Sequence, residues 1–342
     1  MSLWRKSSRA LLIGAAVLSC VGSGCKPGES AGAGTATGTA NPAQPPFMSA
    51  VAGNPPPQAD DAPPPEKTGG FDGKRAYEQV VKQVSFGPRP AGSPAIAKLQ
   101  DYLVGELKSY GCAVDTDSFS ADTPAGRLPM KNILVKIPGE RPGIILLGTH
   151  YDTKRIPDFV GADDAGSSTA VMLEIARLLC AQKKPGKYAV WIAFFDAEEA
   201  VNFDWQDPDH TYGSRQMAAQ LATSGDLPKI KAFLLADIVG GKNPHFKRDG
   251  ESTKWLKDLV WEVAEMLGYG NVFVKEPTNF GGDDHYSFTA RKVSSVDIMD
   301  LDPKDVPYWH TTQDTLDKID AKTLAIVGHV ILEAVKEIQL RK

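Results

Sequence analysis

The sequence predicts an α/β sandwich whose central β-sheet is mostly parallel. Three long apolar runs, at residues 143–150, 188–195 and 230–241, are typical of strands that are buried on both faces of a parallel sheet. Segments with apolar residues at helical spacing, such as residues 167–182 and 321–340, alternate with these runs. Because alternating strands and helices build parallel sheets covered by helices, this order favours the α/β class.

The other expected elements extend this alternation along the chain. They are helices at residues 74–84, 95–110, 214–222 and 253–268, and strands at residues 131–139 and 293–299. No internal repeat is present in the sequence. The segment that holds these elements is long enough for one large domain.

Residues 1–25 have the pattern of an export signal. Basic residues precede an apolar run at residues 10–18, which is too short to span a membrane as a stable helix. Cys20 and Cys25 follow this run, and a cysteine at such a position is typical of lipoprotein processing. We expect export to the bacterial cell envelope and a lipid anchor on Cys20 or Cys25 that holds the protein on a membrane, facing the periplasm or the exterior. A plain cleaved signal is the alternative.

Residues 26–70 predict a disordered tether. Gly, Ala, Thr and Pro dominate this segment, which includes the motifs NPAQPP and DDAPPPEK. Such a composition buries too little apolar surface to offset the entropy that an ordered chain loses. We therefore expect the folded domain to occupy residues 71–342.

Net charge and cysteine spacing argue against two kinds of site, a nucleic-acid interface and a zinc finger. A net charge of −4 gives no case for nucleic-acid binding. Cys112 and Cys180 are far apart in the sequence and have no metal-finger spacing. We expect each to be a small buried residue rather than half of a disulfide, although an exported protein permits disulfides.

Side chains that bind metals follow the predicted strands and recur in two late motifs, GGDDHYSF and PYWHTTQDT. In open α/β sheets, functional residues collect beyond the carboxyl ends of the strands. The candidates are His150, Asp152, Asp163, Asp164, Glu198, Glu199, Asp237, Asp283, Asp284, His285, His310 and Asp314. Two histidines with three carboxylates suit zinc. Asp152 lies two residues after His150, where a carboxylate can orient a histidine ligand.

Single residues of this set also have simpler interpretations. Asp164 starts a helix, where Asp is a common N-cap. His150 or His310 alone is more often structural or exposed than a ligand. Glu198 and Glu199 follow a buried-type strand, which can simply emerge into a solvated acidic turn. These interpretations would all have to hold together for the whole set to be accidental.

The ordered motifs resemble a known family. HYD, GADDAG, FFDAEEA, YGSR, LLADIVG, DDHYSF and YWHT are similar, in this order, to the zinc aminopeptidases of metallopeptidase family 28. HYDTK, DWQDPDHTYGSR, GGDDHYSF and the Trp before the last His resemble the glutaminyl cyclases (glutaminyl-peptide cyclotransferases) within that family. The resemblance extends over residues 71–342. It implies a catalytic domain with a three-layer α/β/α sandwich and a mixed, mostly parallel sheet.

The resemblance also implies a zinc site. Asp164, Glu199 and His310 would be the zinc ligands, and Glu198 would transfer protons. A cation would explain why two adjacent glutamates follow a buried strand, because it neutralises the buried charge of Glu199.

Further side chains receive roles from the same resemblance. His150 and Asp237 match the remaining ligands of a second metal in the aminopeptidases, whereas cyclases keep these residues and use one zinc. Asp237 is also counted among the catalytic side chains, and Asp283 would be the hydrogen-bonded carboxylate near the reacting amide. Trp309 and Trp205 would line the substrate pocket.

The chain departs from the family pattern in two places. Thr149 and Thr169 stand where the animal cyclases have a disulfide. The loop that carries Trp205 is one residue longer, which weakens the assignment of that residue.

Two reactions are compatible with these residues. A cyclase with one zinc ion would convert the N-terminal glutamine of a peptide or protein to pyroglutamate and release ammonia. An aminopeptidase with two zinc ions would instead hydrolyse the N-terminal peptide bond. A metal-stabilised binding module is a third interpretation. We expect a monomer that acts on peptide or protein N-termini.

Overall fold

The computed structural model describes residues 58, 59 and 61–341. Its six-stranded sheet has the order β1-β2-β4-β3-β5-β8. These strands are β1 (Val114–Thr123), β2 (Gly126–Ile137), β3 (Gly139–His150), β4 (Gly186–Phe195), β5 (Ile230–Asp237) and β8 (Ser295–Met299). The helices are α2 (Gly73–Val84), α3 (Pro94–Ser109), α4 (Gly166–Cys180), α5 (Tyr212–Ser224), α6 (Lys254–Met266), α7 (Tyr286–Thr289) and α8 (Ala321–Leu340). Short 3₁₀ helices are η1 (Pro65–Lys67), η2 (Leu227–Lys229) and η3 (Leu316–Lys318), and β6 (Phe246–Asp249) pairs with β7 (Phe273–Thr278).

The central sheet is mixed and mostly parallel, as expected. Strands β4, β3, β5 and β8 are parallel neighbours, whereas β2 runs antiparallel to both β1 and β4. Parallel strands end at the same edge of a sheet, so the residues that follow β3, β4 and β5 meet there.

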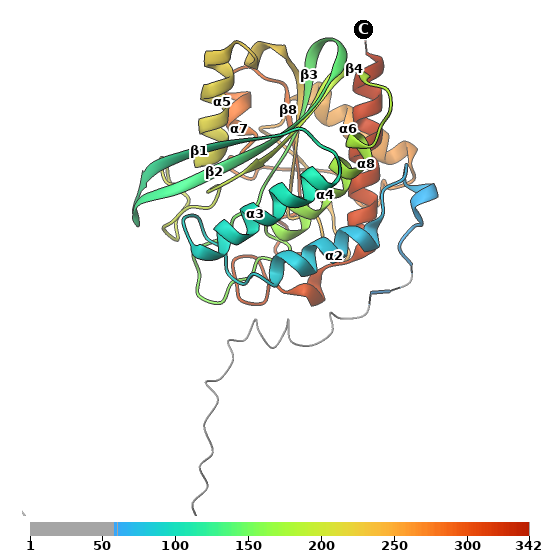
Figure 1. Ribbon diagram of the computed structural model, residues 1–342. Coiled ribbons are helices and arrows are strands. Elements are labelled where there is room, and N and C mark those ends of the chain that lie inside the picture. The colour runs from blue at the N-terminus through green and yellow to red at the C-terminus, as the bar shows by residue number, and fades with distance from the viewer. Residues whose placement is uncertain (1–57, 60, 342) are drawn as a thin grey trace, which may run out of the picture. The chain divides into compact units, whose positions relative to one another are not determined.

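Alternating side chains build the two helical layers on this sheet. Ile145 and Leu147 of β3 pack in the large core formed with α2, α3, α4, α6 and α8. Ile144 and Leu146, which point the other way, pack in a smaller core with α5 and α7. Figure 1 shows α2, α3 and α4 together on one side of the sheet and α5 with α7 on the other. The α/β/α sandwich is therefore confirmed.

The expected helices and strands are present, and capping residues mark several helix starts. Asp72, Ser93 and Asp320 cap α2, α3 and α8 by accepting hydrogen bonds from backbone N–H groups of the first turn. Four elements, β1, β6, β7 and α7, were not among the elements expected from the sequence. β1 is an edge strand without a fully buried residue, so its sequence lacks the apolar run on which the other strands were recognised.

The domain begins before residue 71, which corrects the C-terminal end of the expected tether. Thr68 is buried, and its hydroxyl donates a hydrogen bond of 2.6 Å to the carbonyl of Phe71. Asp61 pairs with Lys322 of α8 at 2.8 Å. The polar, proline-rich composition of this segment gives no sign of these contacts in the sequence. The expected signal at residues 1–25, with Cys20 and Cys25, lies outside the described residues, as does the tether up to residue 57.

Cys112 and Cys180 form a disulfide, so the expectation of two separate thiols is wrong. Cys112 follows α3 and Cys180 is the last residue of α4, and their Cα atoms lie 5.2 Å apart. The 68-residue separation has no local signature, because only the packing of α3 on α4 brings the two residues together.

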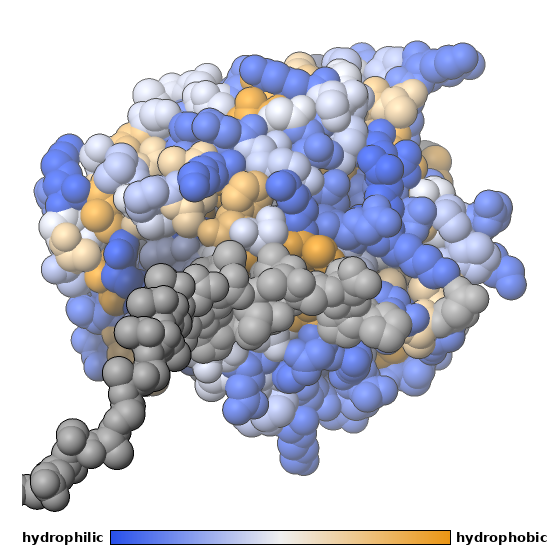
Figure 2. All heavy atoms as spheres, turned by 60° about the horizontal axis from the view of Figure 1, so that its bottom comes forward, coloured by the Kyte–Doolittle hydropathy of each residue, from blue (hydrophilic) through white to orange (hydrophobic). Residues whose placement is uncertain are grey.

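Within the described part of the chain, no helix is long and apolar enough to cross a membrane. Figure 2 shows hydrophilic and hydrophobic residues interspersed over one face of the molecule. Large exposed hydrophobic side chains are scattered along the sequence, at Phe203, Met266, Tyr286, Trp309 and Leu340.

Candidate metal centre and active site

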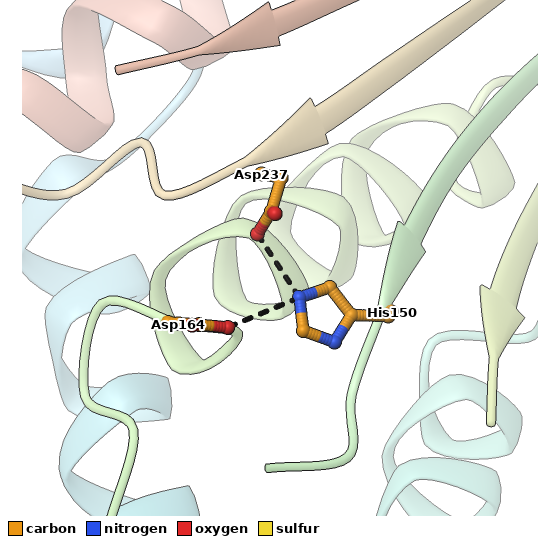
Figure 3. Close-up of side chains that lie close together, drawn as sticks. All are labelled: His150, Asp164 and Asp237. Carbon is orange, nitrogen blue, oxygen red and sulfur yellow. Dashed lines mark hydrogen bonds and ion pairs between the residues drawn. The ribbon is translucent and has the colours of Figure 1, made fainter. Parts of the chain in front are cut away.

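Three predicted ligands converge at the carboxyl edge of the sheet. His150 and Asp237 are the last residues of β3 and β5, and Asp164 lies just before α4 (Figure 3). The Nε2 atom of His150 is 3.0 Å from Oδ1 of Asp237 and 3.3 Å from Oδ1 of Asp164. Asp164 does not cap α4, whose N-cap is Ala165 without a side-chain hydrogen bond. Its carboxylate faces the histidine instead.

A second group shares Asp164. The Nε2 atom of His310 is 3.4 Å from Oδ2 of Asp164 and 3.2 Å from Oε1 of Glu199. Asp164 thus directs one oxygen to each histidine. Glu199 is buried, as is its neighbour Glu198, so the two glutamates do not form a solvated turn.

Burial and hydrogen bonding shift the ionisation of these groups. Burial raises the pKa of Glu198 well above its usual value and also raises the pKa of Glu199. Burial opposes ionisation of Asp164 as well, but hydrogen bonds with His150 and His310 hold its pKa below the usual range. Burial would lower the pKa of His310, yet hydrogen bonds with Asp164 and Glu199 raise it to about 10. The two histidines and Asp164 therefore favour each other's charged forms.

The donor set fits a divalent cation. Nε2 of His150 faces one oxygen each of Asp164 and Asp237, and Nε2 of His310 faces one oxygen each of Asp164 and Glu199. In each set the three ligand atoms lie within 4.8 Å of one another, close enough to share one ion. Imidazole nitrogens with carboxylate oxygens, and no cysteine among them, match the ligands of a catalytic zinc site.

Asp152 supports both parts of this centre. Its Oδ1 atom lies 3.5 Å from Nδ1 of His150, the contact that the sequence predicts. The same carboxylate accepts the backbone N–H of Glu198 at 3.0 Å and of Glu199 at 3.4 Å. Asp152 therefore also holds the loop that carries the two glutamates, a role that its position in the sequence does not reveal.

Asp163 and Asp314 fix the segments around the ligands. Asp314 accepts the backbone N–H groups of Asp163 at 2.8 Å and of Asp164 at 3.1 Å. Asp163 accepts the Tyr308 hydroxyl at 2.7 Å, two residues before His310. These bonds tie the loop before α4 to the loop of His310. Asp163 and Asp314 were expected as candidate metal-binding residues, but their hydrogen bonds to these loops were not predicted.

Lys154 was missed as a site residue. Its side chain is buried, and Nζ lies 3.4 Å from Oε2 of Glu199 and 6.0 Å from the ring centroid of Trp205. Trp205 itself stacks on His210, with centroids 4.3 Å apart. Trp205 is thus connected to the glutamate loop through Lys154. The signal in the sequence was the lysine of the HYDTK motif.

Trp309 and Asp283 lie at this centre as well. The ring of Trp309 stacks on that of His310 at a centroid distance of 4.0 Å, and the side chain is 42% exposed. Asp283 is buried; burial raises its pKa well above the usual range, and the nearby charge of Asp237 adds to this. At the two threonine positions, the Thr169 hydroxyl donates to the carbonyl of His150 at 2.8 Å, and the Thr149 hydroxyl lies 2.8 Å from that of Ser168.

A family comparison decides how this centre is classified. The model of peptidase family M28 matches residues 132–335, a span that holds every ligand described above. The chain belongs to peptidase family M28. The resemblance expected from the ordered motifs is thereby confirmed.

Relatives of this M28 chain include both cyclases and a peptidase. A solved structure of a glutaminyl cyclase from an Acidobacteriales bacterium is 38% identical, covers 84% of this chain and 99% of that chain, and has a TM-score of 0.75. The glutaminyl-peptide cyclotransferase of Drosophila melanogaster is 29% identical over 262 residues, or 69% of this chain and 73% of the relative. A Zn-dependent exopeptidase structure from Parabacteroides distasonis is 32% identical, with 79% and 99% coverage and a TM-score of 0.70.

Proposed function

We propose that this M28 chain is a zinc-dependent glutaminyl-peptide cyclotransferase, which converts the N-terminal glutamine of peptides or proteins to pyroglutamate and releases ammonia. The observation that carries the proposal is the group of Asp164, Glu199 and His310 with the buried Glu198 beside it. This group occurs in a chain that is 38% identical to a glutaminyl cyclase.

Asp164, Glu199 and His310 would hold one zinc ion. Bound there, zinc would polarise the γ-carbonyl of the substrate glutamine. The α-amine of the substrate then attacks the carbonyl carbon of the side-chain amide, the C–N bond of that amide breaks, and its nitrogen leaves as ammonia with the proton taken from the amine. Because the attacking amine belongs to the same molecule, its effective concentration is already high.

Glu198 is the group that moves the proton. Its carboxyl takes a proton from the attacking amine and passes it to the departing ammonia. A raised pKa suits this task, because it makes the carboxylate a stronger base toward the proton of the attacking amine.

The remaining side chains position the substrate. Asp283 and Asp237 would hold the reacting amide by hydrogen bonds. Trp309 presents an apolar wall at the mouth of the centre, since part of its ring is exposed beside His310. Trp205 would form the second wall of the pocket.

The aminopeptidase remains a second candidate for a specific reason. His150 and Asp237 form a further group with Asp164, which would allow a second zinc ion beside the first. Two ions suit the activation of a water for peptide hydrolysis. The similarity to a Zn-dependent exopeptidase is in line with this candidate.

A direct assay distinguishes the two reactions. The zinc-loaded chain is incubated with a glutaminyl peptide, a leucyl peptide, and an N-acetylated glutaminyl peptide as control. We expect pyroglutamate and ammonia from the first peptide and no product from the other two. Free leucine without ammonia would instead establish the aminopeptidase.

We also propose that the protein is exported and anchored to a membrane of the cell envelope by a lipid on Cys20 or Cys25, and that it is monomeric. The Cys112–Cys180 disulfide supports export, because disulfides persist in oxidising compartments. The interspersed surface in Figure 2 is in line with a monomer. Replacing both N-terminal cysteines by serine should move the protein from the membrane fraction to the soluble fraction.

A further inference from the structure

A second polar cluster lies deeper in the sheet than the residues at the strand ends. Those residues, His150, Asp164, Glu198, Glu199, Asp237 and His310, are called the catalytic group below. Asp297 of β8 pairs in register with Leu235 of β5, two residues before Asp237. Residues two apart on a strand point to the same face, so Asp297 and Asp237 share the face that α7 covers. His285 directly precedes α7, and Asp249 ends β6. The side chains of Asp249, His285 and Asp297 are completely buried.

His285 lies between two carboxylates. Its Nε2 atom is 3.6 Å from Oδ2 of Asp249, and its Nδ1 atom is 3.6 Å from Oδ2 of Asp297. Asp283 belongs to the same cluster, because one ligand atom each of Asp283, His285 and Asp297 lie within 4.8 Å of one another.

The cluster contains many unsatisfied polar atoms. Neither ring nitrogen of His285, neither carboxylate oxygen of Asp297 and not Oδ2 of Asp283 forms a hydrogen bond with any described residue. Buried polar groups are normally paired, and several orphans around one histidine indicate a common missing partner. One cation placed between Nδ1 of His285 and the carboxylates of Asp297 and Asp283 would pair with these three groups at once, whereas Nε2 of His285 faces Asp249.

We propose that Asp283, His285 and Asp297 form a second, structural metal site, which binds a divalent cation such as zinc or manganese. The imidazole ligand suits zinc, and the two carboxylates also suit manganese. The site is closed to solvent, so it would be filled as the domain folds. The cation would take no part in the reaction proposed above, but it would hold Asp283, the carboxyl that is assigned there to the reacting amide.

Asp249 and Ser252 complete the arrangement around the ligands. Asp249 faces Nε2 of His285, which leaves Nδ1 directed toward Asp297. The Ser252 hydroxyl donates to Asp249 at 2.8 Å and accepts the backbone N–H of Asp297 at 3.0 Å. A carboxylate that holds the far nitrogen of a ligand histidine is a common feature of metal sites.

The test measures metal content in a chain whose catalytic group cannot hold zinc. The full chain carrying Asp164→Ala and His310→Ala is expressed with ZnCl₂ or MnCl₂, dialysed, and analysed by mass spectrometry for metal per chain. Asp164 serves both catalytic histidines, so these changes disable both groups. We expect about one equivalent of metal to remain. A folded, metal-free protein would overturn the proposal, and the carboxyls would then share protons instead.

Two further variants test the ligands in the same background. His285→Gln should reduce the bound metal at least tenfold, whereas His245→Gln, at an exposed histidine on the surface, should leave it unchanged. Retention of the metal in the His285 variant would contradict the assignment. Because that variant can fail to fold, Asp297→Asn provides a nearly isosteric second test. An anomalous-scattering peak between His285 and Asp297 in crystals of the background chain would support the site, and its absence would refute it.

Discussion

The catalytic group and the buried cluster beside α7 use the same residue types but differ in access. At the strand ends, His310 lies under the partly exposed ring of Trp309, and Asp164 pairs with two histidines. In the buried cluster, the side chains of His285 and Asp297 are inaccessible to solvent and form no hydrogen bonds with the described residues. Composition alone therefore does not identify a site of turnover. The two regions differ in whether a substrate can reach them and in whether each charged side chain has a partner.

The largest expected effect is that of Asp164→Ala. This change removes a carboxylate oxygen from each of the two catalytic histidines, so zinc retention and activity should both be lost. Metal analysis and the ammonia assay measure the two losses. Asp122→Ala, at an exposed aspartate of β1, is the matched control. Full turnover by the metal-free Asp164 variant would show that the ligand assignment is wrong.

Glu198→Gln should lower kcat by about 10² to 10⁴ while the zinc content stays unchanged. The amide keeps the shape of the side chain but cannot carry the proton. Steady-state kinetics with a glutaminyl peptide measure the loss, and Glu140→Gln on the protein surface serves as the control. A loss of zinc along with the activity would instead make Glu198 a ligand.

Removal of the disulfide should separate stability from catalysis. The double variant Cys112→Ser and Cys180→Ser should lower the free energy of unfolding by roughly 2–4 kcal/mol, because the unfolded chain regains the freedom of a long loop. The disulfide lies in the core on the side of α3 and α4, away from α5 and α7. We therefore expect unchanged kcat at low temperature and an earlier transition in urea. Equal midpoints for both proteins would contradict this prediction.

The smallest expected effect is that of Trp309→Ala. Loss of the apolar wall should raise KM about tenfold with little change in kcat, whereas Trp309→Phe should restore most of the binding. Initial rates over a range of substrate concentrations separate the two constants. A fall in kcat alone would mean that the ring acts on His310 rather than on the substrate.

The sequence predicts the strand ends well because apolar runs and polar endings are local signals. His150, Glu199 and Asp237 each follow such a run, and the structure brings them to one edge of the sheet. The sheet layers follow from the same alternation of apolar side chains.

Contacts between distant residues could not be predicted in this way. Asp314 bonds the backbone of Asp164 across 150 residues, and the two cysteines meet across 68. β1 escaped detection because an exposed edge strand needs no apolar pattern. In each case the missing information was the packing of one element on another, which no single segment contains.

The two oxygens of the Asp164 carboxylate face different histidines, which links the two candidate metal positions. One of its oxygens faces His150 and the other faces His310, so a second cation can share a ligand with the first. Substitution of His150 would weaken the second position without touching Glu199 or His310. A change at the second position would therefore alter the number of ions that the centre can hold while the first position keeps its own ligands.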